Sequence, residues 1–193
     1  MSHRARLGRV WGVAESEQAV RFPCDALLDA PDDVLYRGVA IDAPPAVVFR
    51  WLCQLRAAPY SYDWIDNFGR QSPPRWTPGL ERLAIGQRVM RIFTLVGFEP
   101  ERQLTLRIVP NTPAERGFGE VVGTYRVSPQ GTGSRLLVKL LVRYPRGAAG
   151  AFMRRLLPLG DLIMMRRQLL NLKRLAEATR AGHDASVRDA LPA

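Results

Sequence analysis

A helical pattern at about residues 148–181 restricts the possible folds of this chain more than any other stretch of the sequence. Beyond Pro158 its apolar residues recur at alternating steps of three and four: Leu162, Met165, Leu169, Leu172 and Ala176. Residues with this spacing share one face of a helix. So large an apolar face needs an extensive partner surface, which a β-sheet can supply.

Two residues inside this pattern are expected to interrupt it. Proline removes a backbone hydrogen bond from a helix, so Pro158 together with Gly160 should kink or break it. Asp161 can then cap the start of a second helical segment. Gly182 is expected to follow the last helical residue, with Arg180 in the final turn.

The partner surface is predicted from alternating segments that precede the helix. Strand patterns occur at 34–41, 87–96, 104–108, 118–127 and 136–144, with a hairpin turn at 129–133. Two short helices are expected after the first strand, one that starts at the Pro44-Pro45 pair and one at about 61–68. Short connections indicate an antiparallel meander. The sequence therefore predicts an α+β fold in which a curved antiparallel sheet of about six or seven strands wraps around a long C-terminal helix.

The composition suits one domain with extensions. The chain has 193 residues, of which 47% are hydrophobic, enough for a sizeable core. We divide it into an N-terminal arm at 1–32, a domain at 33–181 and a tail at 182–193. No stretch of about 18 uncharged apolar residues occurs, so no transmembrane segment is expected. The arginine-rich start has no apolar signal core, which favours a cytoplasmic location.

The net charge of +10 comes almost entirely from arginine, since Lys139 and Lys173 are the only lysines. The arginines are spread along the chain without a nucleic-acid-binding motif, so no specific nucleic-acid partner is expected. Cys24 and Cys53 form no CxxC pattern, which argues against a metal site. No cofactor is expected, and the oligomeric state stays open.

Several short motifs, in their order along the chain, resemble those of a known superfamily. They are Ile-Asp-Ala-Pro-Pro at 41–45 with Val48, Phe49 and Trp51, Gly-Gln-Arg-Val at 86–89, and Thr-Tyr-Arg-Val at 124–127 before a glycine turn. They resemble the START-like, Bet v 1-like superfamily, also labelled SRPBCC or polyketide cyclase/dehydrase-like, over about residues 33–181. Pro-Tyr-Ser-Tyr-Asp-Trp at 59–64 is similar to a motif of a bacterial branch. The resemblance implies a helix-grip fold with a hydrophobic cavity between the sheet and the long helix.

The segment from Tyr60 to Asn67 crowds two phenols, an indole and two carboxylates into eight residues. One interpretation is a pocket rim in which Tyr60, Tyr62, Asp63 and Trp64 present polar groups to a ligand. The other is a short helix held by its own side-chain hydrogen bonds. The sequence leaves both open.

Further cavity candidates come from the parity of the strands and the helical stripe. Arg91 shares the parity of Phe93 in the strand predicted at 87–96, so it lies either in the cavity or on the surface. The remaining candidates are apolar or phenolic residues on faces expected to look inward: Leu106, Tyr125, Val138, Leu140, Met165 and Leu169.

We expect the cavity to bind or carry a small hydrophobic molecule. A superfamily that includes lipid carriers, hormone receptors and cyclases does not fix the reaction. The alternative is a cofactor-independent cyclase or dehydratase that uses Asp63 and a tyrosine in the same cavity. A third hypothesis is a peripheral membrane or lipid-handling protein, suggested by the basic amphipathic pattern at 152–167.

Overall fold

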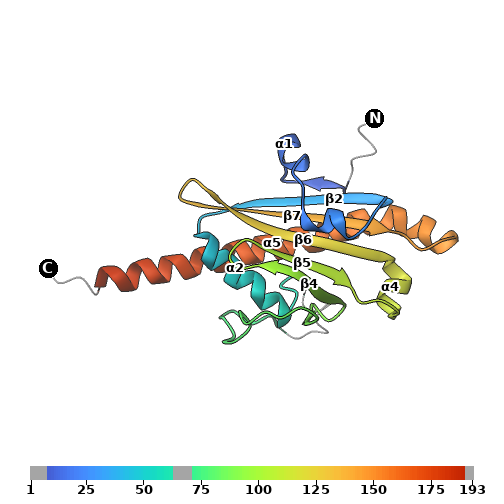
Figure 1. Ribbon diagram of the computed structural model, residues 1–193. Coiled ribbons are helices and arrows are strands. Elements are labelled where there is room, and N and C mark those ends of the chain that lie inside the picture. Colours follow the sequence, from blue (N-terminus) through green and yellow to red (C-terminus); the bar gives the residue numbers. More distant parts are fainter. Residues whose placement is uncertain (1–7, 63–70, 190–193) are drawn as a thin grey trace.

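The computed structural model describes residues 8–62 and 71–189, with side chains described up to residue 182 (Figure 1). Within these ranges a seven-stranded sheet has the order β1-β2-β7-β6-β5-β4-β3. Its strands are β1 Val10–Trp11, β2 Asp33–Ile41, β3 Arg88–Val89, β4 Phe93–Glu99, β5 Gln103–Ile108, β6 Glu120–Gln130 and β7 Gly133–Arg143. All neighbours pair antiparallel except β1 and β2, which are parallel.

The helical elements are shorter except for the last one. They are α1 Glu15–Gln18, η2 Pro23–Ala26, α2 Pro45–Cys53, η3 Gln54–Arg56, α4 Pro113–Phe118 and α5 Ala148–Asp189. In Figure 1, α5 runs along one face of the curved sheet and continues past its edge. The predicted α+β helix-grip fold is confirmed, with α5 as the gripped helix.

Helix α5 corrects the prediction of two segments separated at Pro158. It is one continuous helix with Pro158 inside it, and it runs through Gly182 to Asp189. A proline removes one hydrogen bond and introduces one clash, but it does not by itself end a helix whose other residues are held by packing. Asp161 is therefore an interior residue of the helix and not an N-cap.

The prediction of one continuous strand at 87–96 is also wrong, because two strands separated by a turn lie there. Met90 and Arg91 have φ values of 46° and 64°, so the chain turns there. The two halves, β3 and β4, pair antiparallel as a hairpin in which Val89 lies opposite Phe93. Arg91 therefore belongs to a turn, and strand parity does not decide which way its side chain points.

The helix predicted at about 61–68 lies mostly at 63–70, outside the described residues. Other elements were absent from the prediction, namely β1, α1, η2 and α4. The N-terminal arm packs on the outer face of the sheet, where Phe22, Cys24 and Leu28 form a small second core with residues of β6 and β7. Lys139 of β7 forms an ion pair there with Asp25, at 2.5 Å between Nζ and Oδ1.

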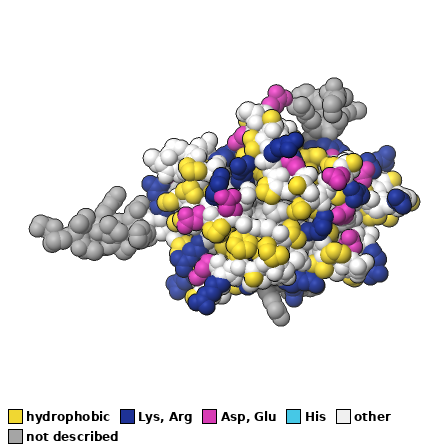
Figure 2. Space-filling view, viewed as in Figure 1, with side chains coloured by type: hydrophobic (Ala, Val, Ile, Leu, Met, Phe, Trp, Pro, Cys, Tyr) yellow, Lys and Arg dark blue, Asp and Glu magenta, His cyan; other side chains and the backbone are white. Residues whose placement is uncertain are grey.

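The main core is dense at one end of the sheet. Helix α2 packs against β6, β7 and α5, and its Val48, Trp51 and Leu52 are fully buried. The indole of Trp51 donates a hydrogen bond to Thr179 Oγ1 of α5 at 3.1 Å. This end is therefore filled by side chains from three directions. On the visible outer face, basic and acidic side chains are interspersed (Figure 2).

Candidate functional site

At the other end of the sheet the side chains of α5 and of the strands do not meet. A cavity of about 830 Å³ separates them. The sheet contributes mainly aliphatic side chains to its wall: Leu35, Phe93, Leu106, Ile108, Val121, Leu140 and Val142. The first half of α5 contributes a flexible apolar wall, in which methionines are prominent: Met153, Leu156, Leu157, Met164 and Met165. The cavity is thus a mainly apolar space between sheet and helix.

Two glycines face this space and help to keep it open. Gly123 of β6 and Gly160 of α5 both line the cavity. A Cβ atom at Gly160 would meet no other atom within 4 Å, so the absence of a side chain there is not required by packing. A Cβ atom at Gly123 would lie 2.4 Å from Leu140 Cδ2, at the end of a flexible side chain.

The rim of the cavity is formed by lining residues that remain exposed. Ile92 next to the β3–β4 turn is 36% exposed, Phe118 of α4 is 42% exposed, and Leu156 of α5 is 49% exposed. Helices α4 and α5 contact each other here. The cavity therefore approaches the surface between the turn, α4 and the first half of α5.

One polar group inside the cavity is a buried pair between Tyr125 and Gln168. The Tyr125 hydroxyl donates to Gln168 Oε1 at 2.7 Å, and Gln168 Nε2 donates to the backbone oxygen of Pro59 at 2.6 Å. Burial raises the pKa of Tyr125, and the negative charge of Asp161 raises it further. The phenol therefore stays protonated and acts as a hydrogen-bond donor.

A second polar group is the carboxylate of Asp161, which lines the cavity and retains 17% side-chain exposure. Its Oδ2 accepts a hydrogen bond from Arg37 Nη2 at 2.6 Å. Burial raises the pKa of Asp161 to about 6, against the opposing effect of the Arg37 charge. An acid of this pKa changes its charge near neutral pH.

Arg37 lies behind Asp161 and is fully buried. Its guanidinium also donates to the backbone oxygens of Gly8 at 2.7 Å, Arg9 at 2.9 Å and Pro158 at 3.4 Å. It thereby connects the N-terminal arm, β2 and α5. A buried arginine held by one carboxylate and several carbonyls fixes the position of that carboxylate.

The candidate residues from the sequence fall into three groups. Arg91, Phe93, Leu106, Tyr125, Leu140 and Met165 line the cavity. Tyr60, Tyr62, Val138 and Leu169 lie outside its wall. Asp63 and Trp64 lie outside the described residues.

Residues of the second group are placed elsewhere for a packing reason. Leu169 and Val138 are 0% and 1% exposed in the main core. They share the inward faces of α5 and β7, but the cavity occupies only another part of those faces. Tyr60 is buried with its ring edge-on to Trp51, at 6.0 Å between ring centroids.

The sequence prediction missed Asp161 and Gln168. If Pro158 breaks the helix, as the sequence pattern predicts, Asp161 is a helix cap and not a cavity residue. The spacing 161, 165, 168 places both polar residues on the same helical face as Met165, which is the signal that could have identified them.

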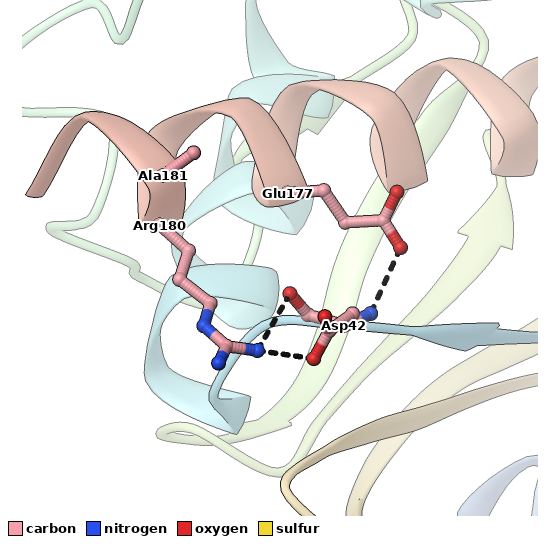
Figure 3. A pocket seen from close by; sticks show the side chains of 4 residues that line it. All are labelled: Asp42, Glu177, Arg180 and Ala181. Carbon is pink, nitrogen blue, oxygen red and sulfur yellow. Dashed lines mark hydrogen bonds and ion pairs between the residues drawn. The ribbon is translucent and has the colours of Figure 1, made fainter. Parts of the chain in front are cut away.

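A second, smaller pocket of about 380 Å³ lies where α5 passes the start of α2 (Figure 3). It is lined by Asp42, Glu177, Arg180 and Ala181. Arg180 forms an ion pair with Asp42, and Glu177 accepts a hydrogen bond from the Asp42 backbone N–H at 2.9 Å. These charged side chains bind one another and attach α5 to the β2–α2 connection. Their role at this pocket is therefore structural.

The described part of the chain contains no group of three or more His, Cys, Asp or Glu side chains placed to bind a metal. Within the same ranges, none of the helices combines the length and the apolar character that crossing a membrane requires. The two cysteines are buried and unpaired, and burial raises the pKa of Cys53 to about 12.

The sequence matches a protein family described as polyketide cyclase / dehydrase and lipid transport, over residues 35–177. No curated protein matches the sequence. Similar solved structures include a Mesorhizobium loti protein, at 17% identity and TM-score 0.47, covering 76% of this chain and 98% of that one. A Nitrosomonas europaea protein matches at 13% identity and TM-score 0.48, covering 82% and 99%. DynU16, from the dynemicin biosynthetic locus, matches at 20% identity and TM-score 0.45, covering 79% and 49%.

Proposed function

Since the chain belongs to the polyketide cyclase / dehydrase and lipid transport family, we propose that it binds and carries a small hydrophobic molecule in the cavity between the sheet and α5. The observation that carries the proposal is the cavity itself. Its volume of about 830 Å³ falls within the range of about 300–1,000 Å³ that is usual for small-molecule sites. Its wall is mainly aliphatic, so affinity would come from burial of apolar surface, at about 25 cal/mol per Å².

The polar groups of the cavity would orient the ligand. Tyr125 and Gln168 satisfy each other, whereas Asp161 Oδ2 is engaged by Arg37 and the carboxylate still faces the cavity. A ligand that carries a hydroxyl group could therefore donate a hydrogen bond to Asp161 while its apolar part lies against the methionines. We expect a mainly apolar molecule with at least one hydrogen-bond donor.

The test compares two glycine substitutions in the same helix. Gly160→Leu places a side chain in the cavity, whereas Gly182→Leu places the same side chain on α5 outside the cavity; neither Cβ atom would meet other atoms within 4 Å. Both changes should favour the helix by up to about 1 kcal/mol, because leucine is a better helix former than glycine. We expect titration with the neutral fluorescent probe N-phenylnaphthylamine to show at least about tenfold weaker binding for Gly160→Leu only.

The proposal fails if the unchanged protein does not bind the probe, or if both variants bind it equally well. Circular dichroism and thermal unfolding verify that each variant is folded. Native mass spectrometry of the purified protein would then identify a co-purified ligand by its mass.

A second candidate function is a cyclase or dehydratase reaction in the same cavity. The specific observation in its favour is Asp161, a cavity-lining carboxyl group whose pKa is raised to about 6 and which can exchange a proton near neutral pH. The Tyr125 hydroxyl donates its proton to Gln168 Oε1, but its oxygen could still accept a hydrogen bond from a substrate hydroxyl. In this alternative the acid–base group is Asp161, since Asp63 lies outside the described residues.

Carrier and enzyme can be distinguished through the bound molecule. Ligand extracted from the unchanged protein and from Asp161→Asn should be identical if the protein is a carrier. If the protein is an enzyme, the variant should retain a precursor, which differs from the ligand of the unchanged protein by the elements of water or by one ring closure.

A further inference from the structure

Four large apolar side chains lie exposed along one line in the first half of α5, and Leu170, which is 39% exposed, lies farther along the same line. Phe152 is 61% exposed, Leu156 49%, Leu159 42% and Ile163 57%. Their steps of four, three and four residues place them on one face, which we name the α5 stripe. The outward face of a surface helix is normally polar, and a continuous exposed apolar patch usually marks an interaction site.

Arginines flank the α5 stripe on both sides. At 100° per residue, Arg155 and Arg166 lie on one flank and Arg167 on the other, and all three are exposed. Between residues 148 and 176 the only acidic residue is Asp161, which lies on the cavity side and pairs with Arg37. Beside the stripe, α5 itself therefore contributes only positive charge.

This combination favours one occupant over another. A second copy of the chain, placed symmetrically on the stripe, would bring arginines close to arginines, and like charges oppose such contact. A bilayer with anionic headgroups complements both features, because the apolar side chains enter the acyl boundary and the arginines reach the headgroups. We propose that the α5 stripe docks this protein on the surface of an anionic lipid bilayer.

The α5 stripe is continuous with the rim of the cavity. Leu156 belongs to both, and Phe118 lies exposed on the neighbouring α4. A protein docked through the stripe would hold the cavity rim against the bilayer, so that an apolar ligand could enter without crossing water. This role for the docking rests on the proposed function, whereas the docking itself does not.

Flotation of the full chain with lipid vesicles tests the proposal. The protein should float with vesicles of phosphatidylcholine mixed with phosphatidylglycerol, and more weakly or not at all with phosphatidylcholine alone. Replacement of both Arg155 and Arg167 by Gln should lower the partition coefficient on anionic vesicles about 25-fold at low salt, about fivefold for each arginine. The matched control replaces Arg75 and Arg82, which are exposed in the loop before β3, and should leave partition unchanged.

The apolar contribution is tested with Phe152→Ser combined with Ile163→Ser. We expect at least about tenfold weaker partition, which persists at high salt because apolar burial is not screened. The control is Ile85→Ser, at a position that is 62% exposed and lies outside the stripe. Circular dichroism verifies the fold of each variant.

Three results would overturn the proposal. The unchanged protein could fail to float, the stripe variants could float as well as their controls, or light scattering could reveal a dimer that the Phe152 and Ile163 replacements dissociate. None of Phe152, Ile163, Arg155 and Arg167 lines the cavity. Both double variants of the stripe should therefore bind the fluorescent probe as the unchanged protein does in the absence of vesicles. If the unchanged protein binds the fluorescent probe but does not float with anionic vesicles, the docking proposal is refuted and the proposed function is unaffected.

Discussion

The ion pair between Arg37 and Asp161 joins two residues in different surroundings. Arg37 is fully buried and surrounded by backbone carbonyls, whereas Asp161 faces the cavity. Desolvation of the carboxylate outweighs its attraction to the guanidinium, so its pKa rises to about 6. The protonation state of one cavity group is thus coupled to the residue that holds the N-terminal arm.

This coupling predicts a pH dependence of stability. Because the pKa of Asp161 is raised from 3.8 to about 6, the folded protein binds the proton more tightly than the unfolded chain. The stabilisation of the folded state by proton binding to Asp161 is therefore fully present below about pH 4, and it is lost as the pH rises through about 6. Asp161→Asn lacks this titration, so at neutral pH it should be more stable than the unchanged protein by roughly 1–3 kcal/mol.

Urea unfolding of both proteins at several pH values measures this difference directly. The two proteins should have similar unfolding free energies near pH 4, since protonated Asp and Asn are both neutral. A variant that is less stable at neutral pH would mean that the attraction to Arg37 outweighs the desolvation of Asp161.

Tyr125→Phe tests the other polar pair of the cavity. The change removes the 2.7 Å hydrogen bond and leaves Gln168 Oε1 buried without that donor. We expect the free energy of unfolding to fall by about 1–2 kcal/mol in chemical denaturation. Tyr62→Phe is the control, since this half-buried ring lies beneath Arg167 and outside the cavity wall. An equal effect of both changes would contradict this account.

Residue types and their parity predicted part of this arrangement. The inward parity of Leu106, Tyr125 and Leu140 agrees with their positions on the cavity wall. Parity could not separate Leu140 from Val138 two residues earlier, because both face inward and only the packing of the assembled core decides which of them lines the cavity. That packing is a long-range property that no local pattern contains.

At the level of elements, α5 continues through a proline that was expected to break it. Pro158 is buried, and its carbonyl accepts a hydrogen bond from Arg37. The bond that a helix loses at a proline is the one to the carbonyl four residues earlier, here that of Arg154, so the Arg37 contact holds Pro158 in place without replacing it. The helix is therefore continuous because of tertiary contacts, which the local sequence does not reveal.

We predict that Pro158→Ala raises the free energy of unfolding by about 1–3 kcal/mol. Alanine restores the missing backbone donor and is favoured over proline in a helix interior by about 3 kcal/mol, from which the loss of buried ring contacts is subtracted. Pro113→Ala is the control, because Pro113 is the first residue of α4, where proline is tolerated. Chemical denaturation that shows Pro158→Ala to be less stable than the unchanged protein would refute this prediction.

For the whole molecule, the sequence predicted the architecture well and the interior poorly. Alternation in the stretches that became β5, β6 and β7 and the helical stripe of α5 were strong enough to indicate a sheet around a helix. The β3–β4 hairpin was missed because Met90 and Arg91 adopt positive φ values that neither residue type signals. The place of the cavity depends on where side chains fail to meet across the sheet, and this follows only from the assembled fold.

Because the interior is filled unevenly, the two parts of α5 should differ in local stability. The part of α5 around Leu169, Leu172 and Ala176 is packed on all inward sides, whereas the part around Gly160 and Met164 borders empty space.

We predict that amide hydrogens at 149–164 exchange with solvent deuterium faster than those at 168–176, although all belong to one continuous helix. Exchange measured by mass spectrometry should slow selectively at 149–164 when an apolar probe is added. Uniform exchange along α5 would contradict this. If the prediction holds, a ligand that enters the cavity would contact the half of the helix that opens locally, while the other half stays packed against the sheet.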